Sequence, residues 1–375
     1  MKEIVKKSFF LAALLIIANV FVARAQSKSL YVYRNGIVEY TQAVTDVDSI
    51  TFATPKPHES VQVVIKELYN GGVQKVGEEG TGAFNNDQYV VLYNNSNQMA
   101  SLENLALGYL LPNNSQASNA YYVGGSPTPY YEAEGWVPAG WAIWAFRGNV
   151  PLAPGEQIVV AIQKAIDNTA TYSNSINFDN PAYYALYDPT AFVNATSYPE
   201  PAAAIPASHY LKGYKFAGLV STAWGLSVTS PAFIIFKTEG VTPEEFAADA
   251  AANAVPDLVA TLPGRKVPVE WVVDGVEVYA QNPGTGTNKK RLTPAIDSGF
   301  IELTNAQGHT LYRNVDQAAT EAIATNAGKL VTGYTADPSG IDAEASIKNG
   351  ARIIYKDTNN STVDFHERNK ASLRD

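Results

Sequence analysis

The stretch from Asp87 to Ser96 reads DQYVVLYNNS, and it indicates the fold class of the chain directly. Its centre, from Tyr89 to Tyr93, contains only aromatic residues, valine and leucine, and most of these favour an extended strand. The polar run that begins at Asn94 then ends the strand. The stretch therefore predicts a short strand with apolar residues on both of its faces.

Other segments extend this pattern along the chain. Two further runs are continuously apolar, as expected of central strands buried on both faces: IVVAI at residues 158–162 and FIIF at residues 233–236. A hairpin is predicted where Asp274-Gly275 separates residues 271–273 from residues 276–278. Regularly spaced short strands with few helical patterns predict a mainly β protein, either a sandwich or a barrel.

Two helices are predicted as small insertions. Thr242-Pro243-Glu244-Glu245 is a capping box with proline at the first helical position, and it opens a helix over residues 246–254. Apolar residues recur at helical spacing from Val315 to Ile323, which predicts a second helix that ends at Gly328. Beyond Thr335 we expect an irregular tail.

The first 25 residues have the pattern of a secretory signal peptide. Three lysines precede an apolar run at residues 9–23, and Ala23-Arg24-Ala25 is a small-x-small cleavage site. The run is shorter than the about 20 residues of a membrane span. We expect export by this signal and a mature periplasmic or extracellular chain that starts at Gln26.

Charge and cysteine content exclude several classes of function. Removing four basic residues and one acidic residue with the leader changes the formal charge from −9 to −12. An acidic surface repels nucleic acid and anionic lipids, so we expect no nucleic-acid partner and no membrane insertion after signal cleavage. The chain has no cysteine, which excludes disulfides, a thiolate metal site, a cysteine nucleophile and a lipidated cysteine.

Residues 26–57 are predicted to form an N-terminal β extension and a linker. Two apolar stretches flank Asn35-Gly36, a strong hairpin signal, and a third strand is expected at residues 49–52. The leader and the phrase VDSITF at residues 47–52 resemble those of secreted proteins of gut Gram-negative bacteria. The predicted division is a signal peptide (1–25), the extension and linker (26–57), a β-sandwich (58–313), and a C-terminal helix and irregular tail (314–375).

Three phrases resemble lamin-tail-like domains, which are immunoglobulin-type β-sandwiches. They are VIKELYN at residues 64–70, DQYVVLYNNS at residues 87–96 and LAPGEQIVVA at residues 152–161. Val91 departs from that family, which usually has an acidic residue there. The resemblance implies an immunoglobulin-like (lamin-tail-like) β-sandwich with small helical insertions and an N-terminal β-hairpin extension.

A closer resemblance covers nearly all of the mature chain. DNPAYY at residues 179–184, KRL at residues 290–292 and DPSGIDAEA at residues 337–345 resemble domain-of-unknown-function family 4876. That group consists of secreted or surface proteins without an established activity, many of them lipid-anchored. The resemblance implies a fold and a compartment, and it provides no catalytic residues.

The chemically reactive residues form no recognised catalytic or cofactor motif. The histidines at positions 58, 209, 309 and 366 share no metal-ligand spacing, and no nucleophile elbow or phosphate-binding loop is present. Residues 357–364 have calcium-like oxygen spacing, but Thr362 stands where an EF-hand loop needs glycine, and Arg368 replaces the closing glutamate. A looser calcium site stays open. We expect no catalytic residue and no cofactor, and apart from that open calcium site the sequence assigns no metal ligand.

The most distinctive local feature is the aromatic loop, residues 121–136. Its rings are interleaved with proline and glycine, and exposed rings on such a loop stack well on a sugar or a partner protein. We predict that some of these rings, with two carboxylates as hydrogen-bond acceptors, bind a carbohydrate or an envelope protein; the residues are Tyr130, Tyr131, Trp136, Glu132 and Glu134. The alternative is that these rings belong to the core.

The sequence thus predicts a non-enzymatic secreted cell-envelope protein, a binding or structural/adhesion module of unknown ligand. Two alternatives stay open. Glu132 and Glu134 would share one face of an extended segment, as the paired carboxylates of an envelope glycan hydrolase require. The other alternative is a soluble accessory to an outer-membrane uptake receptor.

Overall fold

The computed structural model describes residues 30–34, 37–42, 62–116, 121–219, 221–255, 264–284 and 287–374. The chain divides into two compact units, residues 1–60 and residues 61–375. In the first unit, β1 (Leu30–Arg34) pairs antiparallel with β2 (Ile37–Gln42), which confirms the predicted N-terminal hairpin. The predicted signal peptide, the strand at residues 49–52 and the linker lie outside the described residues.

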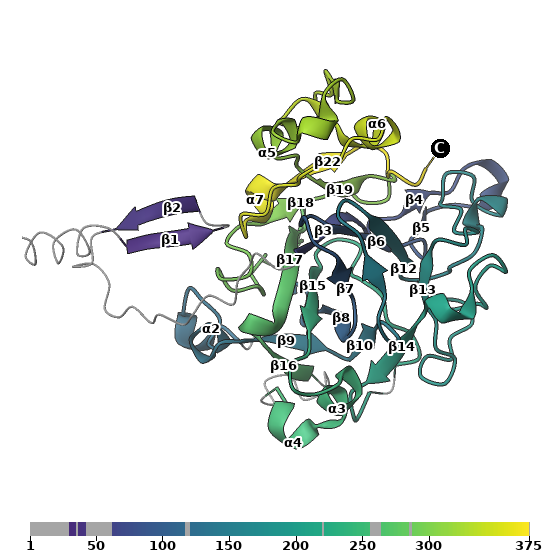
Figure 1. The fold of residues 1–375 in the computed structure, drawn as a ribbon. Coiled ribbons are helices and arrows are strands. Elements are labelled where there is room, and N and C mark those ends of the chain that lie inside the picture. The colour runs from purple at the N-terminus through teal and green to yellow at the C-terminus, as the bar shows by residue number, and fades with distance from the viewer. Residues whose placement is uncertain are drawn as a thin grey trace, which may run out of the picture. The chain divides into compact units, whose positions relative to one another are not determined.

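A twelve-stranded sheet forms the centre of the second unit (Figure 1). Its strands, in spatial order, are β18 (Ile301–Glu302), β17 (Val272–Tyr279), β15 (Ala232–Lys237), β8 (Leu105–Tyr109), β10 (Ala142–Ala145), β14 (Tyr210–Lys215), β13 (Tyr184–Leu186), β12 (Gln157–Ala161), β6 (Tyr89–Asn94), β3 (Val63–Tyr69), β19 (Thr310–Arg313) and β22 (Phe365–Arg368). Strand β13 is parallel to both of its neighbours, and β17 is parallel to β18, whereas the other neighbouring pairs are antiparallel.

The two ends of this sheet, β18 and β22, contact each other, so the sheet curls until it is nearly a barrel. The mainly β class is therefore confirmed. The long strand order belongs to one curled sheet, whereas an immunoglobulin-like sandwich packs two sheets face to face.

The curled sheet has an apolar face on each side. Inward-facing residues such as Leu107, Trp144 and Ile235 form the largest core cluster. Their neighbours along the same strands, such as Ala106 and Ile143, face outward and are also buried. The continuously apolar runs at 158–162 and 233–236 are buried on both faces, as predicted, because further layers cover the outer side of the sheet.

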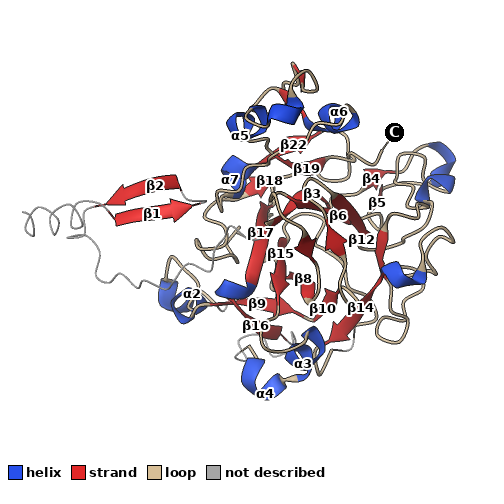
Figure 2. Cartoon of the chain, viewed as in Figure 1, coloured by secondary structure: helices blue, strands red, loops and turns tan. Residues whose placement is uncertain are grey.

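Short strand pairs and helices make up these outer layers, and Figure 2 shows the helices around the periphery of the sheet. The pairs are β4 (Val73–Gln74) with β5 (Ala83–Phe84), β7 (Ala100–Ser101) with β11 (Pro151–Leu152), β9 (Trp136–Gly140) with β16 (Gly264–Pro268), and β20 (Val331–Thr332) with β21 (Ile341–Asp342). The helices are α2 (Tyr131–Glu134), α3 (Pro243–Ala248), α4 (Ala250–Asn253), α5 (Gln317–Glu321), α6 (Ala343–Lys348) and α7 (Ser361–Asp364). In the described residues, no helix is long and apolar enough to span a bilayer.

The hairpin predicted at Asp274-Gly275 is wrong, because both residues lie inside the continuous strand β17. The Asp274 carboxylate is buried and accepts a hydrogen bond from the backbone N–H of Ile65 at 2.6 Å. Gly275 has no room for a side chain, since a Cβ there would stand 2.9 Å from the side chain of Ile296. Asp274 also forms an ion pair with Arg313. The two residues therefore serve an ion pair and close packing, and they do not form a turn.

The predicted capping box at Thr242 is confirmed: the Glu245 N–H donates to Thr242 Oγ1 at 3.2 Å, and Glu245 Oε2 accepts the Thr242 N–H at 2.8 Å. The helix is shorter than predicted, because Asp249 ends α3 and caps α4. The irregular tail predicted beyond residue 335 is instead structured. Asp342 and Asn360 cap α6 and α7, and the chain then enters the sheet as β22.

Candidate functional site

The aromatic loop packs most of its rings inward. Tyr131 is fully buried at the start of α2, and its hydroxyl donates to the Arg291 carbonyl at 2.7 Å. Trp136 is 5% exposed, and its Nε1–H donates to Glu134 Oε2 at 2.7 Å. The prediction that these two rings bind ligand does not fit their burial, since both belong to the cluster that covers the outer face of β8, β10 and β15.

Tyr130 lies between these rings and the solvent. Its ring is half-buried and contacts the rings of Tyr121, Tyr131 and Trp136 at centroid distances of 5.7–6.0 Å. Its hydroxyl is buried and has no hydrogen-bond partner within the described part of the chain. Its ring therefore mainly completes the outer core layer.

The two predicted carboxylates do not face one cleft. Glu132 and Glu134 lie on the helical turn α2, where residues two apart point to different sides, and not on the extended segment that the hydrolase alternative requires. Glu134 is exposed, bonds Trp136, and lies 3.8 Å from the Lys266 ammonium. Glu132 lines a pocket on the other side of the turn.

We call this cavity of about 440 Å³ the tyrosine pocket. It lies between the aromatic loop and the segment that follows β17, two parts of the chain that are far apart in sequence. Its lining residues are Tyr122, Ser126, Pro127, Thr128, Pro129, Glu132, Tyr279, Asn288, Lys289, Lys290, Leu292 and Pro294. Among the predicted site residues, Glu132 alone lines it.

Two tyrosine rings give the tyrosine pocket apolar surface. The Tyr122 hydroxyl donates to the Lys290 carbonyl at 2.8 Å, and the Lys289 ammonium stands 4.5 Å from the centre of the Tyr122 ring. Tyr279 stacks on Phe300 with centroids 4.2 Å apart and an interplanar angle of 14°. Since Phe300 is 42% exposed, this stacked pair continues the aromatic surface towards solvent.

A buried carboxylate fixes the wall of the pocket. Both oxygens of Glu277 accept backbone N–H bonds, from Arg291 at 2.8 Å and from Leu292 at 2.7 Å, and the Lys290 ammonium lies 3.6 Å away. Burial raises the pKa of Glu277 to about 7, although Lys290 lowers it. Because both oxygens already bind the backbone of the turn at residues 290–292, Glu277 is a structural group and is not available as a general acid or base.

The turn is tied to a second loop by Arg291, which is fully buried. Its guanidinium donates to the carbonyls of Pro112 at 2.5 Å and Asn113 at 2.9 Å. The Asn288 side chain closes the preceding loop with two bonds to the Ala280 backbone. The pocket wall is therefore held in place without a ligand.

Comparison with known proteins identifies the family. Residues 153–372, more than half of the chain, match the family described as "Protein of unknown function (DUF4876)". The chain belongs to the DUF4876 family. The predicted resemblance to this family is thereby confirmed over residues 153–372, whereas the lamin-tail-like core is not confirmed.

A solved relative supports the fold. The crystal structure of a DUF4876 family protein from Bacteroides thetaiotaomicron VPI-5482 matches with a TM-score of 0.54 and 22% identity, over 81% of this chain and 70% of that chain. At this identity the likeness shows the fold alone. No curated protein matches the chain.

The DUF4876 match includes β17 and residues 280–294 on one side of the tyrosine pocket. It begins at residue 153 and so does not include the aromatic loop on the other side. Sequence reasoning missed Tyr279, because its partner Phe300 and its position at the pocket depend on contacts between distant segments. Tyr122 lies in the aromatic loop at residues 121–136, but nothing in the local sequence separates its position at the pocket from the buried position of Tyr131.

The described residues of this DUF4876 chain contain no group of three or more histidine, cysteine, aspartate or glutamate side chains arranged to hold a metal ion. At the calcium-like segment, Asp357 and Asp364 lie 3.4 and 3.8 Å from the buried Arg313 guanidinium. Their charges are thus directed to a cation within the protein. His309 pairs with Glu367 at 2.6 Å, and His366 with Asn314 at 2.6 Å.

Proposed function

We propose that the protein is a non-enzymatic, secreted cell-envelope module that binds carbohydrate in the tyrosine pocket. One observation carries this proposal: two tyrosine rings and a carboxylate without a side-chain partner, Glu132, line one preformed cavity. Within the described residues, the Glu132 side chain makes no hydrogen bond or ion pair. Its oxygens are therefore available to sugar hydroxyls.

The chemistry of the lining fits a small glycan. Flat ring faces bury the C–H faces of a pyranose with few rotamers to freeze, and charged groups form strong hydrogen bonds to hydroxyls. The volume of about 440 Å³ lies within the usual range of small-ligand pockets, about 300–1,000 Å³. Lys289 also lines the pocket and adds an ammonium donor beside the Tyr122 ring.

The hydrolase alternative has weaker support. Glycoside hydrolysis uses two carboxyl groups about 5–9.5 Å apart in one cleft. The lining residues of the tyrosine pocket include one carboxylate, Glu132, and the buried Glu277 behind the wall already binds two N–H groups. Binding without turnover is the simpler use of this arrangement.

Export by the N-terminal signal is part of the proposal, supported by its basic residues, its apolar run and the Ala23-Arg24-Ala25 site. The compartment is periplasmic or extracellular, and the protein is also suited to serve an outer-membrane uptake receptor as a soluble accessory. Cell fractionation with N-terminal sequencing tests this. A soluble envelope protein that begins at Gln26 is expected, and an intact leader in the inner membrane would overturn it.

We also retain the lamin-tail-like relationship as a proposal. Its support is that the three phrases which carry the resemblance become neighbouring antiparallel strands, β3, β6 and β12. An experimental structure tests it through the order and pairing of these strands compared with lamin-tail-like domains.

A glycan array on the mature protein tests the binding function. We expect Glu132→Gln to weaken binding about 10- to 100-fold, because it loses a charge-assisted hydrogen bond. Tyr122→Ala is expected to abolish it. The control Glu78→Gln changes an exposed carboxylate outside the pocket and should bind normally.

Two results would overturn the proposal. One is a wild-type protein that binds no glycan, and the other is retention of every bound glycan by both pocket variants. The bound glycan is also incubated with the protein and assayed for new reducing ends, and their release would favour the hydrolase instead.

A further inference from the structure

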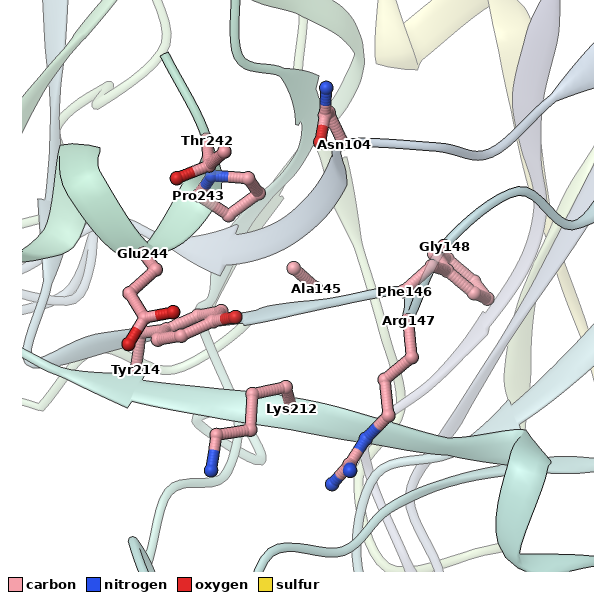
Figure 3. Close-up of a pocket in the computed structure, with 10 residues that line it drawn as sticks. All are labelled: Asn104, Ala145, Phe146, Arg147, Gly148, Lys212, Tyr214, Thr242, Pro243 and Glu244. Carbon is pink, nitrogen blue, oxygen red and sulfur yellow. The ribbon is translucent and has the colours of Figure 1, made fainter.

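A second pocket of about 370 Å³ lies on the outer face of the sheet, apart from the tyrosine pocket (Figure 3). Four segments meet there: the turn before β8, the end of β10 with the residues that follow, β14, and the start of α3. The lining residues are Asn104, Ala145, Phe146, Arg147, Gly148, Lys212, Tyr214, Thr242, Pro243 and Glu244.

The strand ladder explains why a cavity forms here. Ala145 on β10 pairs directly with Lys212 on β14, and Tyr214 lies two residues further along the same face. Helix α3 packs across both strands. Because the Ala145 side chain is small, it leaves a space between the larger side chains around it, and this space is the second pocket.

Lys212 is already neutralised. Its ammonium lies 2.8 Å from Asp188, a carboxylate whose side chain is 3% exposed. Asp188 also accepts the Thr190 hydroxyl at 2.6 Å and the Gly213 N–H at 3.3 Å, and these bonds and Lys212 lower its pKa despite burial. This pair therefore forms a fixed, nearly neutral wall.

Arg147 and Glu244 differ from that pair. In the part of the chain that the structure describes, neither side chain has an ion-pair or hydrogen-bond partner. They stand on opposite sides of the second pocket, and the Tyr214 hydroxyl points between them (Figure 3). Burial and Glu244 raise the pKa of Tyr214 while Arg147 lowers it, so both charges lie close enough to act on this hydroxyl.

We propose that the second pocket binds a small zwitterion, a free α-amino acid or dipeptide, with its ammonium at Glu244 and its carboxylate at Arg147. The arginine fork suits a carboxylate through two parallel N–H bonds. The Tyr214 hydroxyl supplies a further hydrogen bond between the two ends. A volume near 370 Å³ admits a ligand of this size and excludes a long peptide.

Other ligand classes leave one of the two charges unmatched. An inorganic anion would pair with Arg147 and be repelled by Glu244. A diamine would pair with Glu244 and be repelled by Arg147. A neutral sugar would compensate neither charge. Opposite, separated and unpaired charges on one small cavity favour a ligand that carries both signs.

Calorimetry on the mature protein tests the proposal with a panel of free amino acids and with alanyl-alanine. Further probes are its N-acetyl and C-amide derivatives and inorganic phosphate. We expect binding of at least one free zwitterion, and a weakening of about tenfold or more when either terminus is blocked. Phosphate alone should not bind.

Two variants test which residue binds each end of the ligand. In Glu244→Gln, N-acetylation of the ligand should no longer weaken binding. In Arg147→Gln, the C-amide should bind as well as the free acid. The control Glu78→Gln should behave as the wild type. The proposal is overturned if no zwitterion binds to the folded protein, if blocked and free ligands bind equally, or if both pocket variants bind every probe as the parent does. Because the tyrosine pocket is unchanged in these variants, their glycan binding should persist whatever the outcome.

Discussion

Replacing Arg313 with methionine tests how the C-terminal segment is held to the sheet. Arg313 lies on β19 and is 1% exposed. Its Nε–H donates to the Ile65 carbonyl at 2.8 Å, its Nη1 donates to the Lys356 carbonyl at 2.9 Å, and its Nη2 donates to the Asp274 carboxylate. Methionine occupies part of the same volume and makes none of these bonds.

The expected loss in the free energy of unfolding is about 3–5 kcal/mol, the range found when one partner of a buried ion pair is removed. Three carboxylates surround the guanidinium, and two of them, Asp274 and Asp364, are 7% and 2% exposed. Without Arg313 they stay buried, and no other cation of the described residues forms an ion pair with them. The carbonyls of Ile65 and Lys356 also lose their donor, which favours the upper part of the range.

Equilibrium unfolding in urea, followed by tryptophan fluorescence, measures the loss. Arg147→Met is the matched control, because Arg147 is exposed, and its change should stay within about 0.5 kcal/mol. If Arg313→Met costs less than about 1 kcal/mol at an unchanged denaturant slope, the cluster behaves like a surface ion pair and the reasoning is refuted.

Three further predictions concern the core around the pockets. Burial raises the pKa of Glu277 from 4.5 to about 7, so between these pH values the folded protein holds a proton that the unfolded chain has released. The free energy of unfolding therefore falls by up to about 3 kcal/mol as the pH rises from 4.5 to 7. Glu277→Gln should remove that fall in urea titrations, and an unchanged pH dependence would contradict the assignment. Tyr130→Phe removes an unpaired buried hydroxyl and should not destabilise, whereas Tyr131→Phe loses a hydrogen bond and should cost about 1 kcal/mol; melting temperatures that shift equally would argue against this contrast. Gly140→Ala places a Cβ 2.5 Å from the Leu111 side chain and should cost about 1–3 kcal/mol in calorimetry, unless that leucine moves freely.

Strand identity was predictable from local pattern. The runs at residues 89–93, 158–162 and 233–236 are apolar at every position, and each is buried on both faces in the structure. The capping box at Thr242 was predictable for the same reason, since its four residues contain all the donors and acceptors that it uses.

The closure of the sheet was not predictable in this way. It depends on β22 meeting β19 at one end and β18 at the other, contacts between segments about 55 and 65 residues apart in sequence. The turn signal at Asp274-Gly275 failed for a related reason, because a tertiary contact with Arg313 outweighs local turn propensity. The short helices α6 and α7, which are capped by Asp342 and Asn360, were missed because each has too few residues to show a helical apolar period.

The aromatic loop shows how a nearly closed sheet changes the meaning of aromatic density. A sheet with one solvated face has one apolar side to cover, whereas this sheet has an inner core and an apolar outer face. The outer face of β8, β10 and β15 has to be covered by chain from outside the sheet, and Tyr131 and Trp136 bury large area for that purpose. Aromatic rings among prolines and glycines therefore form a covering layer here, and the proposed ligand contacts lie at the edge of that layer. Tyr122 and Glu132 occupy that edge, and they line the tyrosine pocket for that reason.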